Sequence, residues 1–535
     1  MTVIVLFIVS LLTRLLFLYF GFPSVTNDEA DYFINSYLLA KTGSDIYGQR
    51  FFLTSGILNA TSSIPVYLGS FIYHFFEKST IIGRLPFTIF NSLIPVLFYL
   101  ILNKLTKNKT FSFIGFTILN FSPWFSFLSV LSAIDAPTAL VFYLIGFYVL
   151  LTKIKPIYKN ILFLIFSFLS FNSYMGIKTI FPFLVVTAFI SKRIYEKKRL
   201  SIKNIFKDIA VSIVVFVAFF LFSWYAPSSN FFKARMSEKI IPFNSSMLTE
   251  NVNYLRDLSK GPKVARYFLF NKLTVASGMF LDRYMQVFNP HLLFYRGDSH
   301  PLYGTYYYGL FYLFDFIFLI SGLFLIKDIF KRNLTIAIPF ILLLILTPIA
   351  IGITIDGATI SLRGYPMILG YAFFIASGIY YFLSLLTKND KFALLVVFSI
   401  YFLSFVHFFY TYKTIIRYAS SDQWHVNEKT LMDKIEEIRG KSNKKIYIYV
   451  NGPRETMLLY LFYKAGEPNE IKKILSENRL NYKNIYFSDE CPQKKLDGFV
   501  QIIHSERCPI DEEVFTTRPL FLPETFLSSK YLLLE

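Results

Sequence analysis

Three carboxylates stand close together just after the first apolar run of the chain. Residues 3–20 are about long enough to cross a bilayer, and the segment that follows, "FPSVTNDEADYF", carries Asp28, Glu29 and Asp31. A carboxylate beside a substrate hydroxyl can accept its proton, so this segment is a candidate general base. Acidic residues in the first turn of a helix also favour its dipole, which is the purely structural alternative.

A further carboxylate and three cations are expected on the same side of a membrane. Asp135 precedes Pro137 at the start of an apolar run, where it could do chemistry or merely cap a helix. Arg84, Lys178 and Arg363 each begin an apolar run at the same end. Taken singly, each could snorkel to lipid head groups. Together they would suit a site that holds an anionic phosphate beside a proton acceptor.

The segment "NPHLLFYRGDSHPLYG" adds four candidates. Arg296 is a further cation for phosphate binding, while His291, Asp298 and His300 could bind an acceptor or a divalent metal ion. Their spacing is not that of a recognised zinc site, and the ordinary polarity of a surface loop also explains them.

The composition predicts an α-helical polytopic membrane protein. The 535 residues are 54% hydrophobic, and the mean hydropathy of +0.48 is too high for a single water-soluble core. The first run lacks a basic leader and a small-residue cleavage site, so we expect a retained helix. The formal charge of +19 does not indicate nucleic acid, because the lysines lie mostly between apolar runs.

Hydrophobic runs predict eleven transmembrane helices. The loops that would be cytoplasmic are basic, and the short outer loops are nearly free of Lys and Arg. This pattern predicts a plasma-membrane protein whose N-terminus lies on the cytoplasmic side. Two long segments, about 21–84 and 225–306, and everything after 413 then lie outside. The predicted helices are about 3–20, 85–103, 111–127, 136–152, 160–172, 178–191, 208–224, 307–326, 334–354, 364–386 and 392–412.

Two domains follow from this division: a membrane domain, 1–415, and an extracytoplasmic α/β domain, 416–535. The first outer loop should hold an amphipathic surface helix with Asn27 or Asp28 as its N-cap and Gly43 as its C-terminal stop. In the tail, "KKIYIYV", "KNIYFSD" and "FVQIIHS" read as strands, and "NEKTLMDKIEEIRGK" and "PNEIKKILSENRL" as helices. Cys491 and Cys508 could form a disulfide outside the cell or remain thiols.

At these residues the chain resembles the GT-C class of membrane glycosyltransferases, in the glycosyltransferase family 39-like branch of protein O-mannosyltransferases and lipid A aminoarabinose transferases. Arg14, Pro23, Asp28 and Glu29 match the start of that pattern. This chain has "NATSSIPVYL" where relatives often carry a first-loop lysine that meets the carrier phosphate. Further matching segments, in order, are "TGSDIYGQRFF", "IGRLPF", "FSPWFSFLS", "YMGIKTIFP", "NPHLLFYRGDSHPLYGTYYYGLFY", "TPIAIGITIDGATISLRGYPM" and "VNGPRETMLLYLFY".

The resemblance implies an inverting transfer of a sugar from a polyprenyl monophosphate, such as dolichyl phosphate mannose, to an acceptor hydroxyl of a protein, lipid or cell-envelope glycan. Asp28 would be the base, Glu29 would orient the acceptor or loop, and Asp135 is a second candidate base. The set proposed for the donor phosphate is Arg84, Lys178, Arg363 and Arg296.

Two other functions remain open on the sequence. An O-antigen ligase or glycan polymerase would use similar chemistry, usually on a diphosphate carrier. A lipid-linked sugar flippase would also be polytopic with basic inner loops, but such proteins place polar residues along a path open to both sides. Here the acids cluster on one predicted face.

Overall fold

The computed structural model describes most of the chain. It divides into two compact units: a helical unit, formed by residues 1–15, 89–130 and 134–410, and an α/β unit, formed by residues 16–88, 131–133 and 411–535. The residues described are 2–58, 61–131, 135–198, 200–226, 230, 233, 246–300, 302–305, 307–330, 334–354, 360–386, 390–442, 444–493, 495–508, 517–520 and 530–534.

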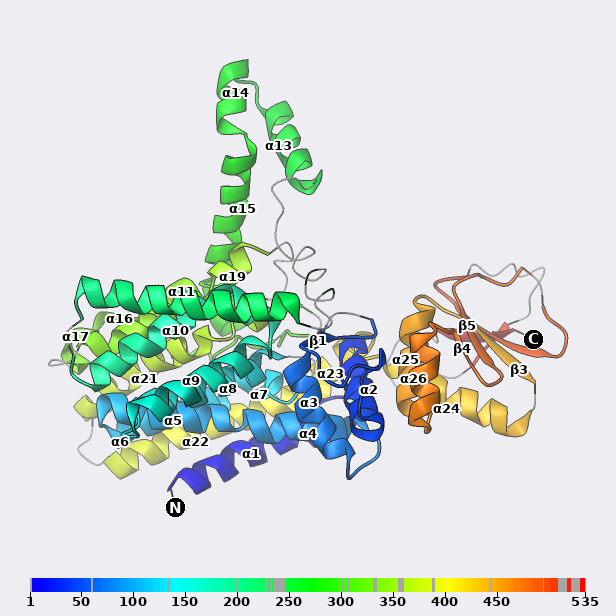
Figure 1. The fold of residues 1–535 in the computed structure, drawn as a ribbon, viewed down its shortest axis with the longest axis horizontal. Coiled ribbons are helices and arrows are strands. Elements are labelled where there is room, and N and C mark those ends of the chain that lie inside the picture. The colour runs from blue at the N-terminus through cyan, green and yellow to red at the C-terminus, as the bar shows by residue number, and fades with distance from the viewer. Residues whose placement is uncertain are drawn as a thin grey trace. The chain divides into compact units, whose positions relative to one another are not determined.

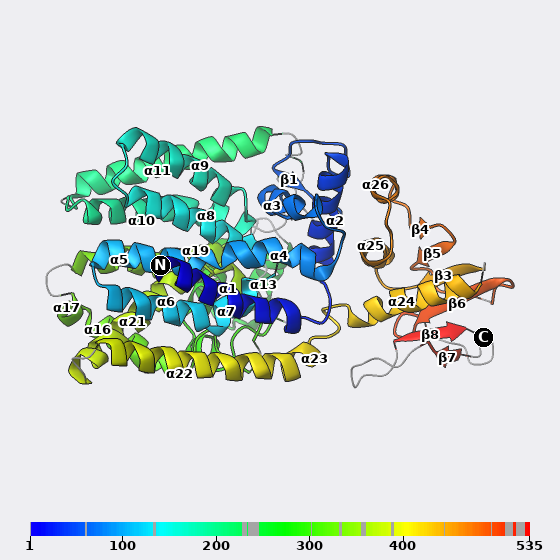
Figure 2. The same ribbon diagram turned by 90° about the horizontal axis from the view of Figure 1, so that it is seen from below.

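Long apolar helices run side by side in the helical unit, and α11 and α22 lie on opposite sides of this bundle (Figures 1 and 2). The helices are α1 (Thr2–Phe20), which continues into the α/β unit, α5 (Leu93–Thr106), α6 (Lys109–Phe121), α7 (Pro123–Leu128), α8 (Asp135–Leu150), α9 (Pro156–Phe171), α10 (Met175–Tyr195), α11 (Ile202–Tyr225), α13 (Ser246–Leu258), α14 (Lys263–Leu269), α15 (Lys272–Gln286), α16 (Asp315–Phe324), α17 (Ile326–Ile329), α18 (Ile338–Leu346), α19 (Ile349–Gly352), α20 (Ile360–Arg363), α21 (Met367–Leu386) and α22 (Asp390–Thr411).

Seven helical segments of the described chain are long and apolar enough to cross a membrane, which confirms the predicted polytopic helical fold. Three other predicted spans correspond to the shorter apolar helices α8, α9 and α16. The seven are Thr2–Phe20, Thr80–Thr106, Met175–Tyr195, Ile202–Tyr225, Leu334–Gly352, Met367–Leu385 and Lys391–Ile415.

Two predicted helices are shorter than the hydrophobic pattern indicated. The run 111–127 breaks into α6 and α7 because Pro123 cannot donate a helical hydrogen bond and the Ser122 hydroxyl caps α7 by accepting the Phe125 N–H. The run 307–326 becomes helical only at Asp315. Before it, the backbone N–H groups of Leu310 and Phe311 donate to the carbonyl oxygens of residues 292 and 293. These N–H groups therefore cannot form the hydrogen bonds of a helix.

Two glycines let α16 and α21 approach backbone to backbone. A methyl group added at Gly322 would lie 1.9 Å from the carbonyl oxygen of Phe374, and one at Gly378 would lie 2.1 Å from that of Phe318. Small residues at such crossings allow the close packing that holds membrane helices together.

The α/β unit is built on a six-stranded sheet. Its strand order is β4-β5-β3-β6-β8-β7, with β3 parallel to β5 and β6 and the other pairs antiparallel. The elements are α2 (Asn27–Thr42), β1 (Thr54–Ser55), β2 (Thr61–Ser62), α3 (Ser63–Tyr73), α4 (Thr80–Asn91), α23 (Arg417–Ala419), α24 (Val426–Lys441), β3 (Lys445–Tyr449), α25 (Pro453–Tyr463), α26 (Pro468–Ser476), β4 (Asn481–Tyr482), β5 (Ile485–Ser488), β6 (Phe499–His504), β7 (Thr517–Pro519) and β8 (Tyr531–Leu534).

Apolar residues of β3, β5 and β6 form one core with α24, α25 and α26, as the alternating pattern of the tail predicted. The three predicted strands and two predicted helices of the tail are confirmed. Cys491 and Cys508 form a disulfide. The same core includes α2, whose Phe33 ring lies 5.5 Å from that of Phe462, so residues 29–38 of α2 are buried.

The chain enters the α/β unit for the last time at residue 411. The unit also contains residues 16–88. The contacts that join these two stretches, which are over 300 residues apart, leave no trace in local sequence patterns.

Candidate functional site

The three acids of the first loop occupy the first turns of α2. Thr26, one residue before the expected start, is the N-cap: its hydroxyl accepts the Glu29 N–H, and its own N–H donates to the Glu29 carboxylate. This reciprocal arrangement fixes the helix start, and the left-handed Gly43 ends the helix. Asp28, in the same first turn, is partly exposed.

The Glu29 carboxylate also forms a buried ion pair with Arg84. The guanidinium donates from Nε to Oε1 at 2.8 Å and from Nη2 to Oε2 at 2.5 Å, and both side chains are 1% exposed. Nη2 also donates to the carbonyl oxygen of Ser24 at 2.6 Å. The rings of Phe22 and Trp424 lie 4.9 and 5.6 Å from the guanidinium carbon. This arrangement locks the start of α2 to α4.

Asp31 has a different partner, the loop that follows α2. Its carboxylate accepts the backbone N–H groups of Ile57, at 2.9 and 3.1 Å, and of Leu58, at 2.9 Å, and the amide of Asn35 at 2.7 Å. The hydrogen bonds of Asp31 and the ion pair of Glu29 account for the burial of these two carboxylates, whereas Asp28 is partly exposed.

A second group of predicted residues meets in the helical unit. His291, Arg296 and Asp298 line a hollow of about 580 Å³ together with residues of α15 and α20. His291 and Arg296 are exposed; His291 begins a single turn of π-helix, His291–Tyr295, and Arg296 follows it. The sequence had singled out these residues, and the structure places them in one cavity wall.

Asp298 anchors the late segment that carries Arg363. Its Oδ2 accepts the N–H of Ser361 at 2.9 Å and the Ser361 hydroxyl at 2.8 Å, while Oδ1 accepts the His300 N–H at 3.0 Å. Trp124 joins the same junction, because its indole N–H donates to the Ser361 carbonyl and its backbone N–H to that of residue 310. Three of the quoted motifs therefore meet at Ser361.

Arg363 ends α20 and reaches back to Thr354, whose hydroxyl oxygen lies 2.5 Å from its Nη1. The guanidinium of Arg283 donates to the carbonyl oxygen of the same threonine. Two cations from different segments thus converge on Thr354, which gives this part of the helical unit a concentrated positive charge.

Lys178 and Asp135 occupy helix starts. Lys178 lies in the first turn of α10, is 3% exposed, and its ammonium lies 3.4 Å from the side-chain oxygen of Asn172 and 4.8 Å from the ring centre of Phe171. Asp135 is the first residue of α8 and is buried, with Pro137 in the first turn of the helix.

The possible metal ligands do not assemble. Among the residues that the structure describes, no group of three or more His, Cys, Asp or Glu side chains could hold a metal ion. Asp298 is occupied by Ser361, and His300 stacks on Tyr303 with ring centres 4.4 Å apart. Burial lowers the pKa of His300, which favours the neutral imidazole.

Comparison with known protein families finds no match, and no curated protein matches the sequence. Solved structures do match. The crystal structure of ArnT from Cupriavidus metallidurans bound to undecaprenyl phosphate aligns with a TM-score of 0.54 and 10% identity, over 99% of this chain and 97% of that one. The chain has the GT-C fold of ArnT.

Two further structures align less closely. They are ArnT in the apo state, with a TM-score of 0.48 and 9% identity over 99% and 97% of the two chains, and the oligosaccharyltransferase AglB from Archaeoglobus fulgidus, in complex with an inhibitory peptide and a dolichol-phosphate. AglB aligns with a TM-score of 0.44 and 12% identity over 94% of this chain and 69% of its own.

Within this GT-C fold, two polar positions in apolar helices escaped the sequence analysis. Asp315 opens α16 and accepts hydrogen bonds from the Tyr312 N–H and the Tyr401 hydroxyl. His407 of α22 contacts the Tyr308 hydroxyl and lines a hollow of about 590 Å³ rich in aromatic residues. An ionisable residue inside a predicted span is itself a signal of function, and applying that rule would have found both.

Proposed function

We propose that this protein is a glycosyltransferase that takes a sugar from a polyprenyl-monophosphate carrier and transfers it to an acceptor hydroxyl. The observation that carries the proposal is the partly exposed carboxylate of Asp28 at the first turn of α2, beside the rigid Glu29–Arg84 pair. The shared fold supports the choice of donor, because ArnT was solved with undecaprenyl phosphate bound.

The proposed reaction is a single displacement. The acceptor oxygen attacks the anomeric carbon of the sugar while the bond from that carbon to the phosphate oxygen breaks, and Asp28 takes the proton of the acceptor hydroxyl. The electron pair of the broken bond stays on the phosphate, which leaves as polyprenyl phosphate. Inversion at the anomeric carbon follows from a single displacement.

The leaving phosphate needs positive charge more than a proton donor, because it is already stable as an anion. We assign this role to Lys178, Arg296 and Arg363, each at the start or end of a helical segment. Arg84 takes a positioning role, since two of its nitrogens are bound by Glu29 and the Ser24 carbonyl. Asp135 remains the second candidate base.

The hollow lined by His291 and Arg296 is proposed to receive part of a substrate. Its volume of about 580 Å³ falls in the range of ordinary small-molecule sites, and polar side chains are among the residues that line it. Asp298 would shape this hollow through Ser361 rather than touch the substrate. No step of the proposal passes through a metal ion.

We infer that the reaction takes place on the extracytoplasmic side, with the N-terminus in the cytoplasm. The basic loops between the predicted spans support this orientation. The disulfide between Cys491 and Cys508 also supports it, because disulfides persist in oxidising compartments. Residues 416–535 would then form an extracytoplasmic domain.

A transfer assay with the purified full-length protein in detergent tests the function. Polyprenyl monophosphate and polyprenyl diphosphate donors with the same radiolabelled sugar are compared, with a pool of peptide, lipid and glycan acceptors. We expect labelled product and free polyprenyl phosphate from the monophosphate donor. Product from the diphosphate donor alone would indicate a ligase or polymerase. A protein that moves the donor across vesicles but makes no product would be a flippase.

A further inference from the structure

The segment 246–286 folds as a helical hairpin that protrudes from the bundle. Helices α13 and α15 pack on each other through Leu248, Val252 and Val275, and the short α14 forms the far end. Two arginines close this end: Arg256 donates to the carbonyl oxygen of Phe270, and Arg266 to that of Arg256. The hairpin therefore has its own small core and a defined tip.

The hairpin lies crosswise to the long helices of the same unit, such as α11 (Figure 1). Because α11 is long and apolar enough to cross the membrane, an element crosswise to it lies along the membrane plane. Its base meets an apolar span: the Phe280 ring packs against Gly352, the last residue of the span Leu334–Gly352, and the Tyr284 hydroxyl donates to the carbonyl oxygen of Ile345 within that span. This junction places the hairpin at a membrane boundary.

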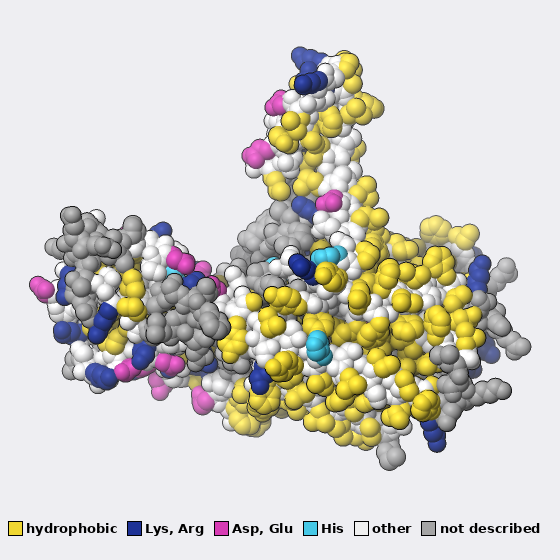
Figure 3. All heavy atoms as spheres, turned by 180° about the vertical axis from the view of Figure 1, so that it is seen from behind, with side chains coloured by type: hydrophobic (Ala, Val, Ile, Leu, Met, Phe, Trp, Pro, Cys, Tyr) yellow, Lys and Arg dark blue, Asp and Glu magenta, His cyan; other side chains and the backbone are white. Residues whose placement is uncertain are grey.

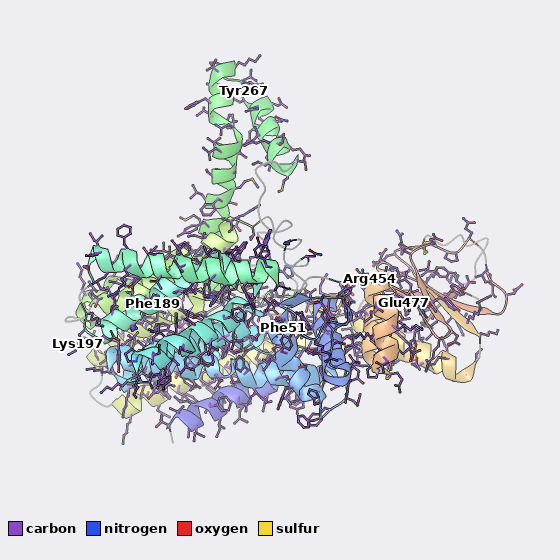
Figure 4. All side chains as sticks on the ribbon, in the orientation of Figure 1. Phe51, Phe189, Lys197, Tyr267, Arg454 and Glu477 are labelled. Carbon is purple, nitrogen blue, oxygen red and sulfur yellow. A yellow bond between two sulfur atoms is a disulfide. The ribbon has the colours of Figure 1, made fainter. Side chains whose placement is uncertain are left out.

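The surface of the hairpin is unusually apolar for an element that leaves the bundle. Val264 is 83% and Phe268 is 77% exposed. Hydrophobic side chains run along one side of the hairpin in Figure 3, and Figure 4 labels Tyr267 near its tip. The other exposed apolar residues are Met247, Tyr254, Leu258, Tyr267, Leu269, Leu273, Leu281 and Met285.

The polar residues of α13 are sorted to another side. Met247, Tyr254 and Leu258 recur at helical spacing on one face and are exposed, whereas Glu250, Asn253 and Asp257 form a separate exposed polar face. An apolar groove of about 470 Å³ also opens between α13 and α15, lined by residues such as Leu255, Leu269 and Met279. One side of the hairpin thus suits hydrocarbon and another suits water.

Charge at the tip is of one sign. The stretch 258–273 contains Lys260, Lys263, Arg266 and Lys272 and no acidic residue. Lys260 and Lys263 are exposed, and Lys and Arg gather at the end of the hairpin in Figure 3. Basic groups interleaved with exposed aromatic and aliphatic groups are typical of helices that lie in the head-group region of a bilayer.

We propose that the hairpin 246–286 is seated in the bilayer interface, with its apolar face among the acyl chains and its tip lysines on the phosphates of anionic phospholipids. This membrane contact does not depend on the proposed transferase chemistry. It would brace the segment that leads into the hollow at His291, because α15 ends five residues before that histidine.

The test uses the full-length protein reconstituted at one copy per lipid nanodisc. Phe268→Cys supplies a thiol for an environment-sensitive fluorophore, because the chain's two native cysteines are joined in a disulfide. Asn253→Cys on the polar face of α13 is the matched control. We expect nitroxide groups on the acyl chains to quench the label at 268 at least threefold more than the label at 253, and aqueous iodide to show the reverse order.

The contribution of the lysines is tested with the triple variant Lys260→Gln, Lys263→Gln, Lys272→Gln. Acyl-chain quenching at 268 should be at least twofold greater in anionic than in zwitterionic nanodiscs, and the triple variant should lose this difference. The control variant Lys444→Gln, Lys483→Gln, Lys495→Gln removes three exposed lysines of the α/β unit and should keep it.

Two outcomes would overturn the proposal. Equal iodide quenching at 268 and 253 in one-copy nanodiscs would show that the tip stands in water. The label at 268 could instead be protected from iodide only when two copies share a disc, without being quenched by the acyl-chain nitroxides. That result would assign the apolar face to a second copy of this chain.

Discussion

The carboxylate of Glu29 and the guanidinium of Arg84 form a two-pronged ion pair between two segments that are 55 residues apart, and neither side chain is more than 1% exposed. Buried charges of this kind are costly to leave alone, so each residue holds the other in place. The pair fixes the first turn of α2, and with it the backbone that carries Asp28.

Breaking this pair should destabilise the protein strongly. Arg84→Met or Glu29→Leu alone leaves an uncompensated buried charge, which costs on the order of 3–5 kcal/mol. The double variant removes both charges and should be less destabilised than the sum of the two single variants. Thermal unfolding in detergent measures the three midpoints. Lys434→Met, which breaks the exposed pair with Glu437, is the control and should change stability by less than about 1 kcal/mol. Strictly additive effects would contradict the pairing.

Asp28 and Asp31 should separate activity from stability. Asp28→Asn removes the proposed base and should lower turnover by about 10²- to 10⁴-fold, with a smaller loss of stability than Asp31→Asn causes. Asp31→Asn weakens the acceptor of the Ile57 and Leu58 N–H groups. It should therefore lower the free energy of unfolding by about 1–3 kcal/mol, which appears as a lower thermal midpoint. Sugar transfer and thermal unfolding are measured on both variants. Full turnover by Asp28→Asn would remove it from the base role.

Hydrophobic periodicity predicted the fold well because most of this chain is held by local, apolar helices. Each predicted helix has a counterpart, and the three strands predicted in the tail lie next to one another in one sheet. The errors arise where non-local hydrogen bonds decide the backbone. Residues 310 and 311 look helical in sequence, but their N–H groups are taken by residues 292 and 293.

The candidate site was predictable in its residue types and not in its connections. Acids at a helix start and basic residues at span ends can be read from the sequence, and that reading selected Asp28, Glu29 and Arg84. That Arg84 binds Glu29, or that Asp298 holds Ser361 from 63 residues away, depends on tertiary packing. The hairpin was missed because its apolar residues are interleaved with lysines in runs too short for a span.

Arg363 should matter for the donor more than for the acceptor. Arg363→Ala removes a proposed phosphate contact, and a charge-assisted hydrogen bond of about 1.5–3 kcal/mol corresponds to a tenfold or greater loss of donor affinity. Thr354→Val is the matched control, because it removes the hydroxyl beside Arg363 but keeps the carbonyl that Arg283 uses. Binding of a polyprenyl-phosphate sugar and the KM for each substrate are compared. Equal donor affinity in Arg363→Ala and the parent protein would refute this placement.

Lys78 should make the stability of the α/β unit depend on alkaline pH. Its ammonium donates to the carbonyl oxygens of Leu461 and Ala465 near the end of α25, and burial lowers its pKa to about 8. Between pH 8 and the unfolded value near 10.5, the unfolded chain binds a proton that the folded chain does not. Stability from this group therefore rises with pH across that window, and the penalty is fully present below pH 8.

The variant Lys78→Met abolishes this titration. The free energy of unfolding should rise between pH 7.5 and pH 9.5 by more in the parent protein than in Lys78→Met. The difference should be on the order of 1–2 kcal/mol, since one pKa unit corresponds to about 1.4 kcal/mol. Lys444→Met removes an exposed lysine and should show the same pH dependence as the parent protein. This control separates the effect of Lys78 from that of removing any lysine. If the parent and Lys78→Met respond identically to pH, the Lys78 ammonium is not buried against α25 in solution.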